Sequence, residues 1–284
     1  MPATYADHRA QLKAILRGWG MPEDNAEITA EVLAWSDLHG VDSHGISMIP
    51  RYDALRRSGR VRMDARPRIV SQTPVSAVVD GGGGLGHVPA HFAMSTAIAK
   101  AKTVGMAAVV VRGSAHFGAA GFYTLMAANT GLVGIACTSA SSIQVAPTFG
   151  KQARLGTDPW SFAAPNADGA PFLLDMATTT VAAGRIRNKA NENLPTPDGW
   201  VLDREGRPSN DPLVAKEKGG FLTSLGGSPE NSSYKGYGLA VMVAGDPQWK
   251  LAETRLRDGI PVGAGLMAQV RQIAQAAAAP WLLD

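Results

Sequence analysis

Hydrophobic residues in the first part of the chain recur at helical spacing. An acidic stretch after Pro22 suits the N-terminus of a second helix, and Gly40 is a natural stop for it. The N-terminal 60 or so residues are therefore predicted to be helical. The positions expected on the buried face of the first helix are Leu12, Ile15 and Leu16.

From Val70 onward, short apolar runs separated by glycine replace the helical pattern. Two stretches between them, 89–105 and 120–131, have the length and the flanking residues of helices. This alternation predicts an α/β fold whose strands are buried on both faces. Residues 191–229 are rich in Pro, Gly, Asn and Asp, and are predicted to form a long surface excursion. The predicted strands are 74–81, 105–114, 131–139, 160–165 and 171–178.

Composition and charge narrow the class of protein. Of 284 residues, 45% are hydrophobic and 18% are charged, which is typical of a globular chain. A net charge of only +3, without a basic run, argues against a nucleic-acid partner. The single cysteine, Cys137, fits a reducing compartment, and neither a signal-like N-terminus nor an apolar run of membrane-spanning length is present. We therefore expect a soluble, cytoplasmic protein without a membrane partner.

The stretch Asp37–Tyr52, DLHGVDSHGISMIPRY, places unusual polar chemistry between two helical segments. Ser43 and His44 are adjacent in it, and histidine carries protons effectively only when neighbouring groups orient it. This density favours a functional loop over a histidine that merely caps a helix. Arg51 and Tyr52 add a guanidinium and a phenol near the same place.

His116 directly follows the predicted strand 105–114. The carboxyl ends of strands are where α/β proteins gather their binding sites, so a functional role is favoured over a structural one. Gly118 and Gly121 keep space open around this histidine.

Two other patterns point to sites less strongly. Gly81, Gly83 and Gly86 form a GxGxxG pattern, but residues 99–112 contain no acidic residue to hold a ribose, so a Rossmann fingerprint is not predicted. His87 and His91 have metal-ligand spacing without a third ligand. Capping or packing is the preferred interpretation of this pair, and no metal site is predicted.

Three polar positions near later elements complete the candidates. Asp175 interrupts an otherwise apolar strand, so its carboxylate must be bonded to a partner or used. Lys235 opens a helix beside Gly236, where an ammonium and a bare backbone suit an anion such as phosphate; a solvated helix start is the alternative. Thr157 lies in a polar turn before a strand.

Taken together, these segments resemble the malate/L-lactate dehydrogenase family of the sulfolactate dehydrogenase type, which is unrelated to the Rossmann-fold malate and lactate dehydrogenases. The resemblance implies an α/β fold of the family's own, a non-Rossmann three-layer sheet with helices, and a homodimer. It implies a helical subdomain of residues 1–66 completed by 250–284, and a region 67–249 that binds cofactor and substrate. The matching segments are, in order, HGVDSHG, SAHFGAAGFY, LGTDPWSFAAP, FLLDMATTT and KGYGLA.

The same resemblance implies NAD- or NADP-dependent reduction of a small 2-oxo acid, or oxidation of the 2-hydroxy acid. Reduction of a cyclic imino acid by the same family, and a non-catalytic nucleotide or metabolite binder, remain alternatives. His44 and His116 look like the catalytic histidines, with Ser43 beside the first, and either could give the proton. The implied cofactor contacts are Asp175, Met176, Ala177, Lys235, Gly236, Gly245 and Asp246, and the substrate contacts are Arg51, Tyr52 and Thr157.

The sequence departs from the family pattern at two places. Family members often carry an arginine, suited to a substrate carboxylate, where this chain has Met48, and Arg51 is the nearest replacement. After Val243 the family continues for several dozen residues, whereas this chain passes at once to a segment resembling the family's C-terminus. We expect that the sequence joins across a missing piece. An intact mass of 29.7 kDa would refute that expectation.

Overall fold

The N-terminal part of the chain is helical, as predicted. The fold is seen in a computed structural model, which describes residues 4–244 except 141, 168 and 218. Leu12 and Leu16 on the first helix are fully buried. The helices are α1 (Tyr5–Gly18), α2 (Glu23–Leu38) and α3 (Ile49–Arg57), with two short 3₁₀ turns, η1 (Asp42–His44) and η2 (Ile46–Met48), between α2 and α3.

These helices share one hydrophobic core. Its central side chains have almost no exposed surface, and burying a leucine fully contributes about 1.5–3 kcal/mol relative to leaving it in water. This core fixes η2 and α3, and therefore the chain on either side of them. Its members include Leu12, Leu16, Leu33, Met48, Tyr52 and Leu85.

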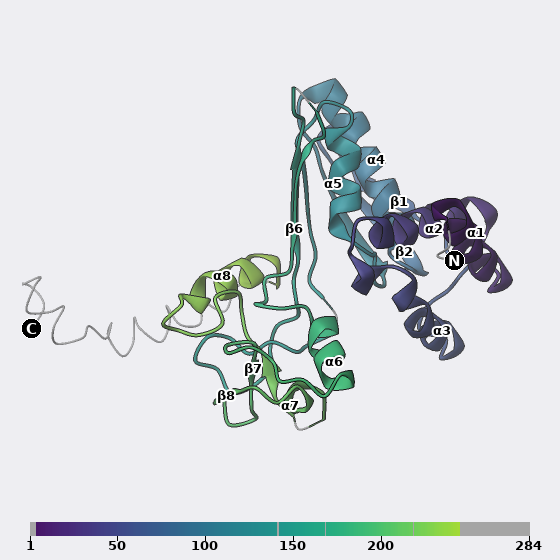
Figure 1. The fold of residues 1–284 in the computed structure, drawn as a ribbon. Coiled ribbons are helices and arrows are strands. Elements are labelled where there is room, and N and C mark those ends of the chain that lie inside the picture. Colours follow the sequence, from purple (N-terminus) through teal and green to yellow (C-terminus); the bar gives the residue numbers. More distant parts are fainter. Residues whose placement is uncertain (1–3, 141, 168, 218, 245–284) are drawn as a thin grey trace, which may run out of the picture. The chain divides into compact units, whose positions relative to one another are not determined.

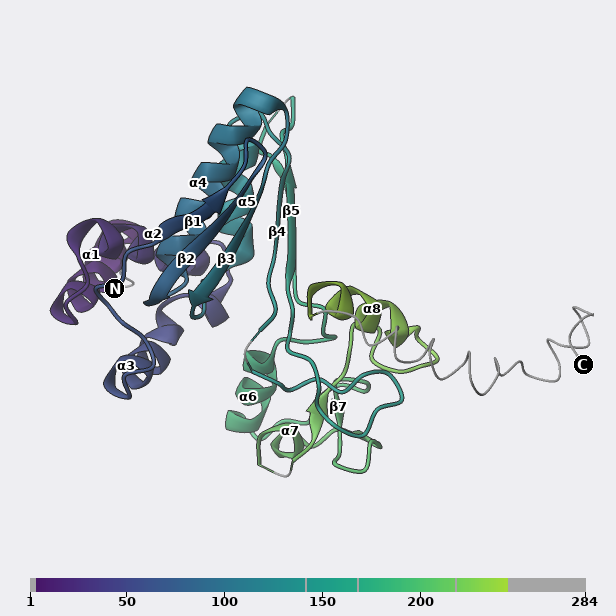
Figure 2. The same cartoon turned by 180° about the vertical axis from the view of Figure 1, so that it is seen from behind.

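A first sheet follows the helices. Strand β2 (Ser76–Gly84) pairs antiparallel with β1 (Arg68–Gln72) and parallel with β3 (Ala108–Ser114). Helix α4 (His87–Val104) connects the parallel pair and packs on one face of the sheet, as Figure 2 shows. Because β2 and β3 are parallel, the residues that follow them meet at one edge of the sheet.

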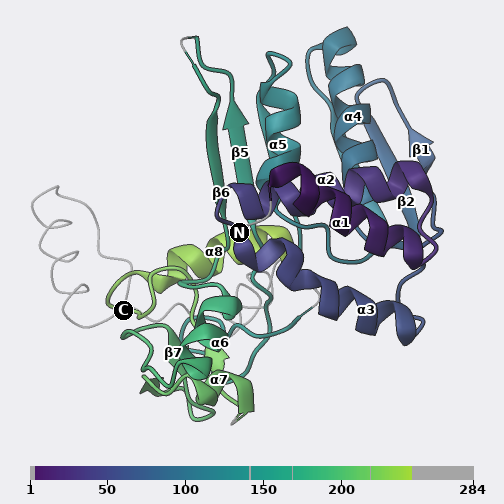
Figure 3. The same cartoon turned by 45° about the vertical axis from the view of Figure 1, so that its right-hand side comes forward.

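A second sheet is antiparallel throughout, in the order β4–β5–β6. Its strands are β4 (Gly134–Cys137), β5 (Trp160–Ala164) and β6 (Phe172–Met176), and helix α5 (Ala120–Ala128) covers one face. Helices α4 and α5 also pack against each other, and Figure 3 shows both between strands of the two sheets. The predicted α/β class is confirmed, and each predicted strand overlaps an observed one, although β2 extends past its predicted end and β1 was not predicted.

The expectation that these strands are buried on both faces is wrong. Val110 on β3, Ile135 on β4 and Phe172 on β6 are 62%, 58% and 57% exposed. The reason is that, in the described part of the chain, a helix packs on one face of each sheet and the other face is left uncovered.

The remaining described residues form a third part with a core of its own (Figure 1). Residues 191–229, predicted as a surface excursion, instead supply a small sheet in the order β8–β7–β9 and a helix, so that prediction is wrong. Val201 and Leu222 on this sheet are 0% and 3% exposed. The elements are α6 (Ala183–Asn191), β7 (Val201–Leu202), β8 (Pro208–Ser209), α7 (Leu213–Glu217), β9 (Phe221–Leu222) and α8 (Ser233–Ala244).

Some predictions cannot be compared with the fold. Gly245, Asp246 and the segment 250–284, expected to complete the N-terminal subdomain, lie outside the described residues. The division into domains therefore stays a prediction. None of the helices within residues 4–244 is long and apolar enough to cross a bilayer.

Candidate active site

Asp37, near the end of α2, holds the loop that carries Ser43 and His44. One carboxylate oxygen of Asp37 accepts the backbone N–H of Ile46 at 2.7 Å and lies 2.7 Å from Nε2 of His8. A β-carbon at Gly45 would lie 1.9 Å from this carboxylate, so only glycine allows the approach. The turn η1 then places Oγ of Ser43 2.8 Å from Nδ1 of His44.

The glycine-rich segment 81–86 holds the loop of His116. The N–H of Ala115 donates to the carbonyl of Gly84, and the N–H of Gly86 donates to the carbonyl of His116, both at 2.9 Å. A β-carbon at Gly86 would lie 2.3 Å from the carbonyl oxygen of Ala115. Strand β2 runs through Gly84, so these glycines serve strand pairing and close packing rather than a phosphate-binding turn.

The two predicted histidines are brought together. The ring centroids of His44 and His116 are 5.2 Å apart, with an interplanar angle of 29°. The hydroxyl of Tyr52 lies 2.7 Å from Nδ1 of His116 and 3.4 Å from Nε2 of His87. Three histidines and a tyrosine therefore form one connected cluster.

From the sequence, His87 was interpreted as a capping or packing residue. Its position could have indicated a place in the site, since His87 follows β2, His116 follows β3, and these strands are parallel neighbours. Side chains that follow adjacent parallel strands meet at the same sheet edge.

Burial disfavours the charged form of these imidazoles. It lowers the pKa of His44, and the nearby Arg51 guanidinium acts in the same direction. Burial lowers the pKa of His87 to about 3 and that of His116 to about 2. The charges of His44, His87 and Arg51 further disfavour an imidazolium at His116.

The predicted substrate contacts lie in different surroundings. Arg51 is exposed and has no acidic partner among the residues described. Tyr52 is fully buried and directs its hydroxyl to His116. The carbonyl of Thr157 accepts the N–H of Thr178 at 2.9 Å, and no hydrogen bond of the described residues links Thr157 to the histidines.

Met48 belongs to the N-terminal core. Its side chain is 8% exposed, among apolar side chains of α1, α2 and α3. An arginine in this orientation would bury a guanidinium without a partner, which costs several kcal/mol. Arg51, in contrast, keeps its charge in contact with solvent beside the histidine pair.

The predicted cofactor residues on β6 and α8 are also close together. The carbonyl of Thr178, just past Ala177, accepts the N–H of Leu225 at 2.9 Å. Leu225 packs on Gly236, where a β-carbon would lie 2.4 Å from the Leu225 nitrogen. This contact brings the exposed Lys235, in the first turn of α8, near the end of β6.

Asp175 is bonded to a partner. Its Oδ2 accepts the N–H of Gly121 at 2.7 Å, in the first turn of α5. Burial raises the pKa of Asp175, and this hydrogen bond acts in the opposite direction. The helix that follows the His116 loop is thereby tied to the strand expected to contact the cofactor.

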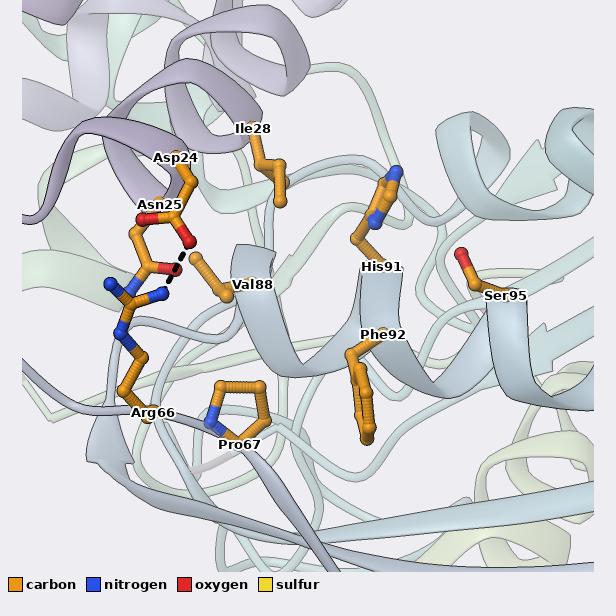
Figure 4. A pocket seen from close by; sticks show the side chains of 9 residues that line it. All are labelled: Asp24, Asn25, Ile28, Arg66, Pro67, Val88, His91, Phe92 and Ser95. Atoms are coloured by element: carbon orange, nitrogen blue, oxygen red, sulfur yellow. Dashed lines mark hydrogen bonds and ion pairs between the residues drawn. The ribbon is translucent and has the colours of Figure 1, made fainter.

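A cavity of about 380 Å³ lies apart from these groups (Figure 4). An ion pair between Asp24 and Arg66 borders it, and His91 points toward it from α4. His87 and His91 thus serve different places, and no three His, Cys, Asp or Glu side chains of the described residues group as metal ligands would. The lining residues are Asp24, Asn25, Ile28, Arg66, Pro67, Val88, His91, Phe92 and Ser95.

The sequence profile described as "Malate/L-lactate dehydrogenase" matches residues 3–244. The chain belongs to this family. A relative named malate dehydrogenase, from Pyrococcus horikoshii, is 42% identical over 230 residues, which are 81% of this chain and 63% of the relative. One named L-sulfolactate dehydrogenase, from Methanocaldococcus jannaschii, is 38% identical over 81% of this chain and 64% of its own length. The chain thus spans less than two thirds of these members of the malate/L-lactate dehydrogenase family.

Solved structures give the same relationship. The malate dehydrogenase of Entamoeba histolytica has a TM-score of 0.82 and 34% identity, covering 86% of this chain and 69% of that one. A Δ1-piperideine-2-carboxylate reductase from Pseudomonas syringae has a TM-score of 0.79 and 32% identity, over 86% and 71% of the two chains. A relative named for NADP⁺, the (2R)-3-sulfolactate dehydrogenase of Chromohalobacter salexigens, is 37% identical over 81% of this chain and 66% of its own length. The family resemblance and fold class predicted from sequence are confirmed.

Proposed function

We propose that this chain carries the acid/base site of an NAD(P)-dependent oxidoreductase that interconverts a small 2-oxo acid and its 2-hydroxy acid. The observation that carries the proposal is the stacked pair of His44 and His116 beside Arg51. Each imidazole has its Nδ1 bonded, and within the described residues neither Nε2 has a partner. The relatives named malate and sulfolactate dehydrogenase support a 2-hydroxy acid as the substrate class.

The proposed mechanism uses three side chains on the substrate. Arg51 binds the carboxylate, because a guanidinium matches its two oxygens with two parallel N–H donors. His44 and His116 present their Nε2 atoms to the oxygen on the neighbouring carbon. In reduction, one of the two rings, as imidazolium, gives its proton to that oxygen. In oxidation, the neutral ring takes the proton back.

The dinucleotide would be held by residues 175–177 at the end of β6 and by Lys235 and Gly236 on α8. When bound in its reduced form, it supplies the hydride. An exposed ammonium in the first turn of a twelve-residue helix fits a phosphate, since the N-terminus of a helix favours negative charge. The NADP⁺ relative supports use of NAD or NADP. Gly245 and Asp246 remain predicted contacts beyond the described residues.

Three related proposals concern substrate, assembly and location. The similarity to a Δ1-piperideine-2-carboxylate reductase, together with Met48 in place of the expected arginine, favours a cyclic imino acid as the second candidate substrate. We also propose a homodimer, supported by the exposed apolar side chains of the second sheet, and a cytoplasmic location, supported by the free thiol of Cys137.

The decisive experiment follows oxidation of NADH and of NADPH in the presence of a panel of 2-oxo acids and cyclic imines. We expect turnover of at least one 2-oxo acid, with saturation by substrate and cofactor. Turnover of cyclic imines alone would select the second candidate. Cofactor binding without oxidation for every compound would overturn both in favour of a non-catalytic binder.

A further inference from the structure

A buried chain of hydrogen bonds leads away from the proposed site. Tyr52 and His87 have no exposed surface. The Tyr52 hydroxyl is 2.7 Å from Nδ1 of His116, and the weaker second contact, to Nε2 of His87, is 3.4 Å. The rings of Tyr52 and His87 also pack edge to face, with centroids 5.5 Å apart. Which atom donates in each bond decides where the proton of His116 lies.

A backbone amide indicates which atom donates in the hydrogen bond between Tyr52 and His116. The N–H of Gly118 points at Nδ1 of His116, at 3.4 Å. An amide N–H can only donate, so this long contact favours a lone pair on Nδ1 and, in a neutral His116, a proton on Nε2. The much shorter contact from the Tyr52 hydroxyl, at 2.7 Å, is then the main donor to Nδ1. A β-carbon at Gly118 would lie 2.8 Å from Val32 and 3.2 Å from His87, so glycine allows this close arrangement.

The His87 end of this series of hydrogen bonds independently indicates the same direction of donation. His87 is the first residue of α4, where the helix dipole disfavours an imidazolium. Its Nδ1 is buried and has no partner among the described residues. A proton on that nitrogen would leave a buried donor unsatisfied, which is rarer and costlier than an under-used acceptor. The proton of His87 therefore belongs on Nε2, where it donates to the Tyr52 oxygen.

His44 has different surroundings. Among the described residues, its Nδ1 has one partner, the hydroxyl of Ser43, at 2.8 Å. A hydroxyl can rotate to donate to a neutral ring or to accept from an imidazolium, whereas the amide of Gly118 cannot. His44 can thus change charge without losing its hydrogen bond, and His116 cannot.

We propose that His87 and Tyr52 are positioning residues that hold His116 neutral with its proton on Nε2, so that His116 polarises the substrate oxygen and His44 carries the transferred proton. This inference rests on the proposed function. In reduction, hydride adds to the carbonyl carbon, and the proton leaves the His44 imidazolium for the oxygen. His44 ends neutral, while His116 keeps its proton and contributes a hydrogen bond.

The charged and titratable groups around His116 agree with this assignment. They come from η1, α3, α4 and α5, and none of those acting on His116 is a carboxylate in the described part of the chain. No charged group acting on His116 within the described residues therefore favours the imidazolium. The groups are His44, Arg51, Tyr52, His87 and, behind Tyr52, Tyr123.

The test is nitrogen NMR of the full chain labelled with ¹⁵N-histidine, with the His116 signals assigned by their loss in His116→Gln. We expect a neutral ring with its proton on Nε2 from pH 8 to pH 5, and a titrating His44. In Tyr52→Phe the ring should lose this single tautomer and kcat should fall about 100-fold, without a matching rise in the KM of the cofactor. His87→Leu should shift the tautomer in the same sense, while His87→Gln, which keeps a donor toward Tyr52, should restore it.

The wild-type spectra decide the matter even if a variant fails to fold. A proton on Nδ1 of His116, or titration of this ring between pH 8 and pH 5, would overturn the inference. These spectra need no turnover, so the two proposals fail separately. An active enzyme with the wrong tautomer refutes the positioning role alone. The expected tautomer without turnover on any substrate refutes the proposed function alone.

Discussion

The two halves of the proposed site are built in different ways. In the histidine half, side chains bond to one another, and the central members, Tyr52 and His87, are fully buried. In the cofactor half, backbone contacts bring Lys235 near the end of β6, while the lysine itself is exposed. The first half is therefore organised before any ligand binds, whereas the second leaves its charge free for one. Electrostatic preorganisation of this kind suits proton transfer.

Removal of the two histidines of the first half should have the largest effect on activity. His44→Ala and His116→Ala should each lower kcat by about 10²–10⁴-fold, the usual contribution of a positioned acid or base. Circular dichroism should show that the variants remain folded.

His39→Ala is the matched control for these variants. His39 is exposed, stacks on Trp35 at 4.3 Å and bonds to the Trp35 carbonyl, outside the cluster. Its replacement should leave kcat unchanged. Rates near wild type for both His44→Ala and His116→Ala would refute the assignment of the site.

The histidine half should also make the stability of the folded protein sensitive to acid. The pKa of His87 is about 3 and that of His116 about 2 in the folded chain, against about 6.5 when unfolded. The unfolded chain therefore binds more protons below pH 6.5, and stability falls as the pH drops. Between pH 7 and pH 5 each of the two histidines should remove about 2 kcal/mol from the free energy of unfolding.

Urea unfolding at the two pH values measures this loss. In His87→Gln the loss should shrink by about 2 kcal/mol, because this group no longer titrates. An equal stability of the wild type at pH 7 and pH 5 would contradict the neutral, buried cluster.

The contrast between the halves also explains what sequence could predict. His44 and His116 could be chosen as candidates because His44 lies in a polar loop after a helix and His116 directly follows a predicted strand. The bond from Tyr52 to His116 could not, since it depends on how α3 packs beside the end of β3. The exposed faces of the strands were missed because a run such as that around Val110 has the same pattern whether one face is covered or two.

The glycine-rich segment 81–86 and Met48 also show what could not be predicted from sequence alone. No Rossmann fingerprint was predicted from Gly81, Gly83 and Gly86, but the role of this segment in holding the His116 loop could be recognised only from its partner residues Ala115 and His116. Met48 could be recognised as a departure from the family pattern. That Met48 packs in the N-terminal core while Arg51, three residues later, is exposed depends on the tertiary structure and could not be predicted from sequence.

The cofactor half can be tested with a smaller effect. Lys235→Ala should raise the KM of the dinucleotide about 10-fold, or about 1.4 kcal/mol, and change kcat little, because a phosphate contact is made equally before and during reaction. Lys102→Ala, an exposed lysine in the last turn of α4, is the control. An unchanged KM would remove Lys235 from the site.

The smallest predicted effect concerns the outer face of the second sheet, which adjoins the cofactor half. Leu174 on β6 is 43% exposed in the single chain, so Leu174→Ala should change the free energy of unfolding of the monomer by less than about 0.5 kcal/mol. Leu16→Ala, at a fully buried leucine, should cost about 2–5 kcal/mol in the same assay. A cost at Leu174 close to that at Leu16 would mean that this face is covered in solution. If that cost also grew with protein concentration, the cover would be a second copy of the chain, since only association makes stability depend on concentration.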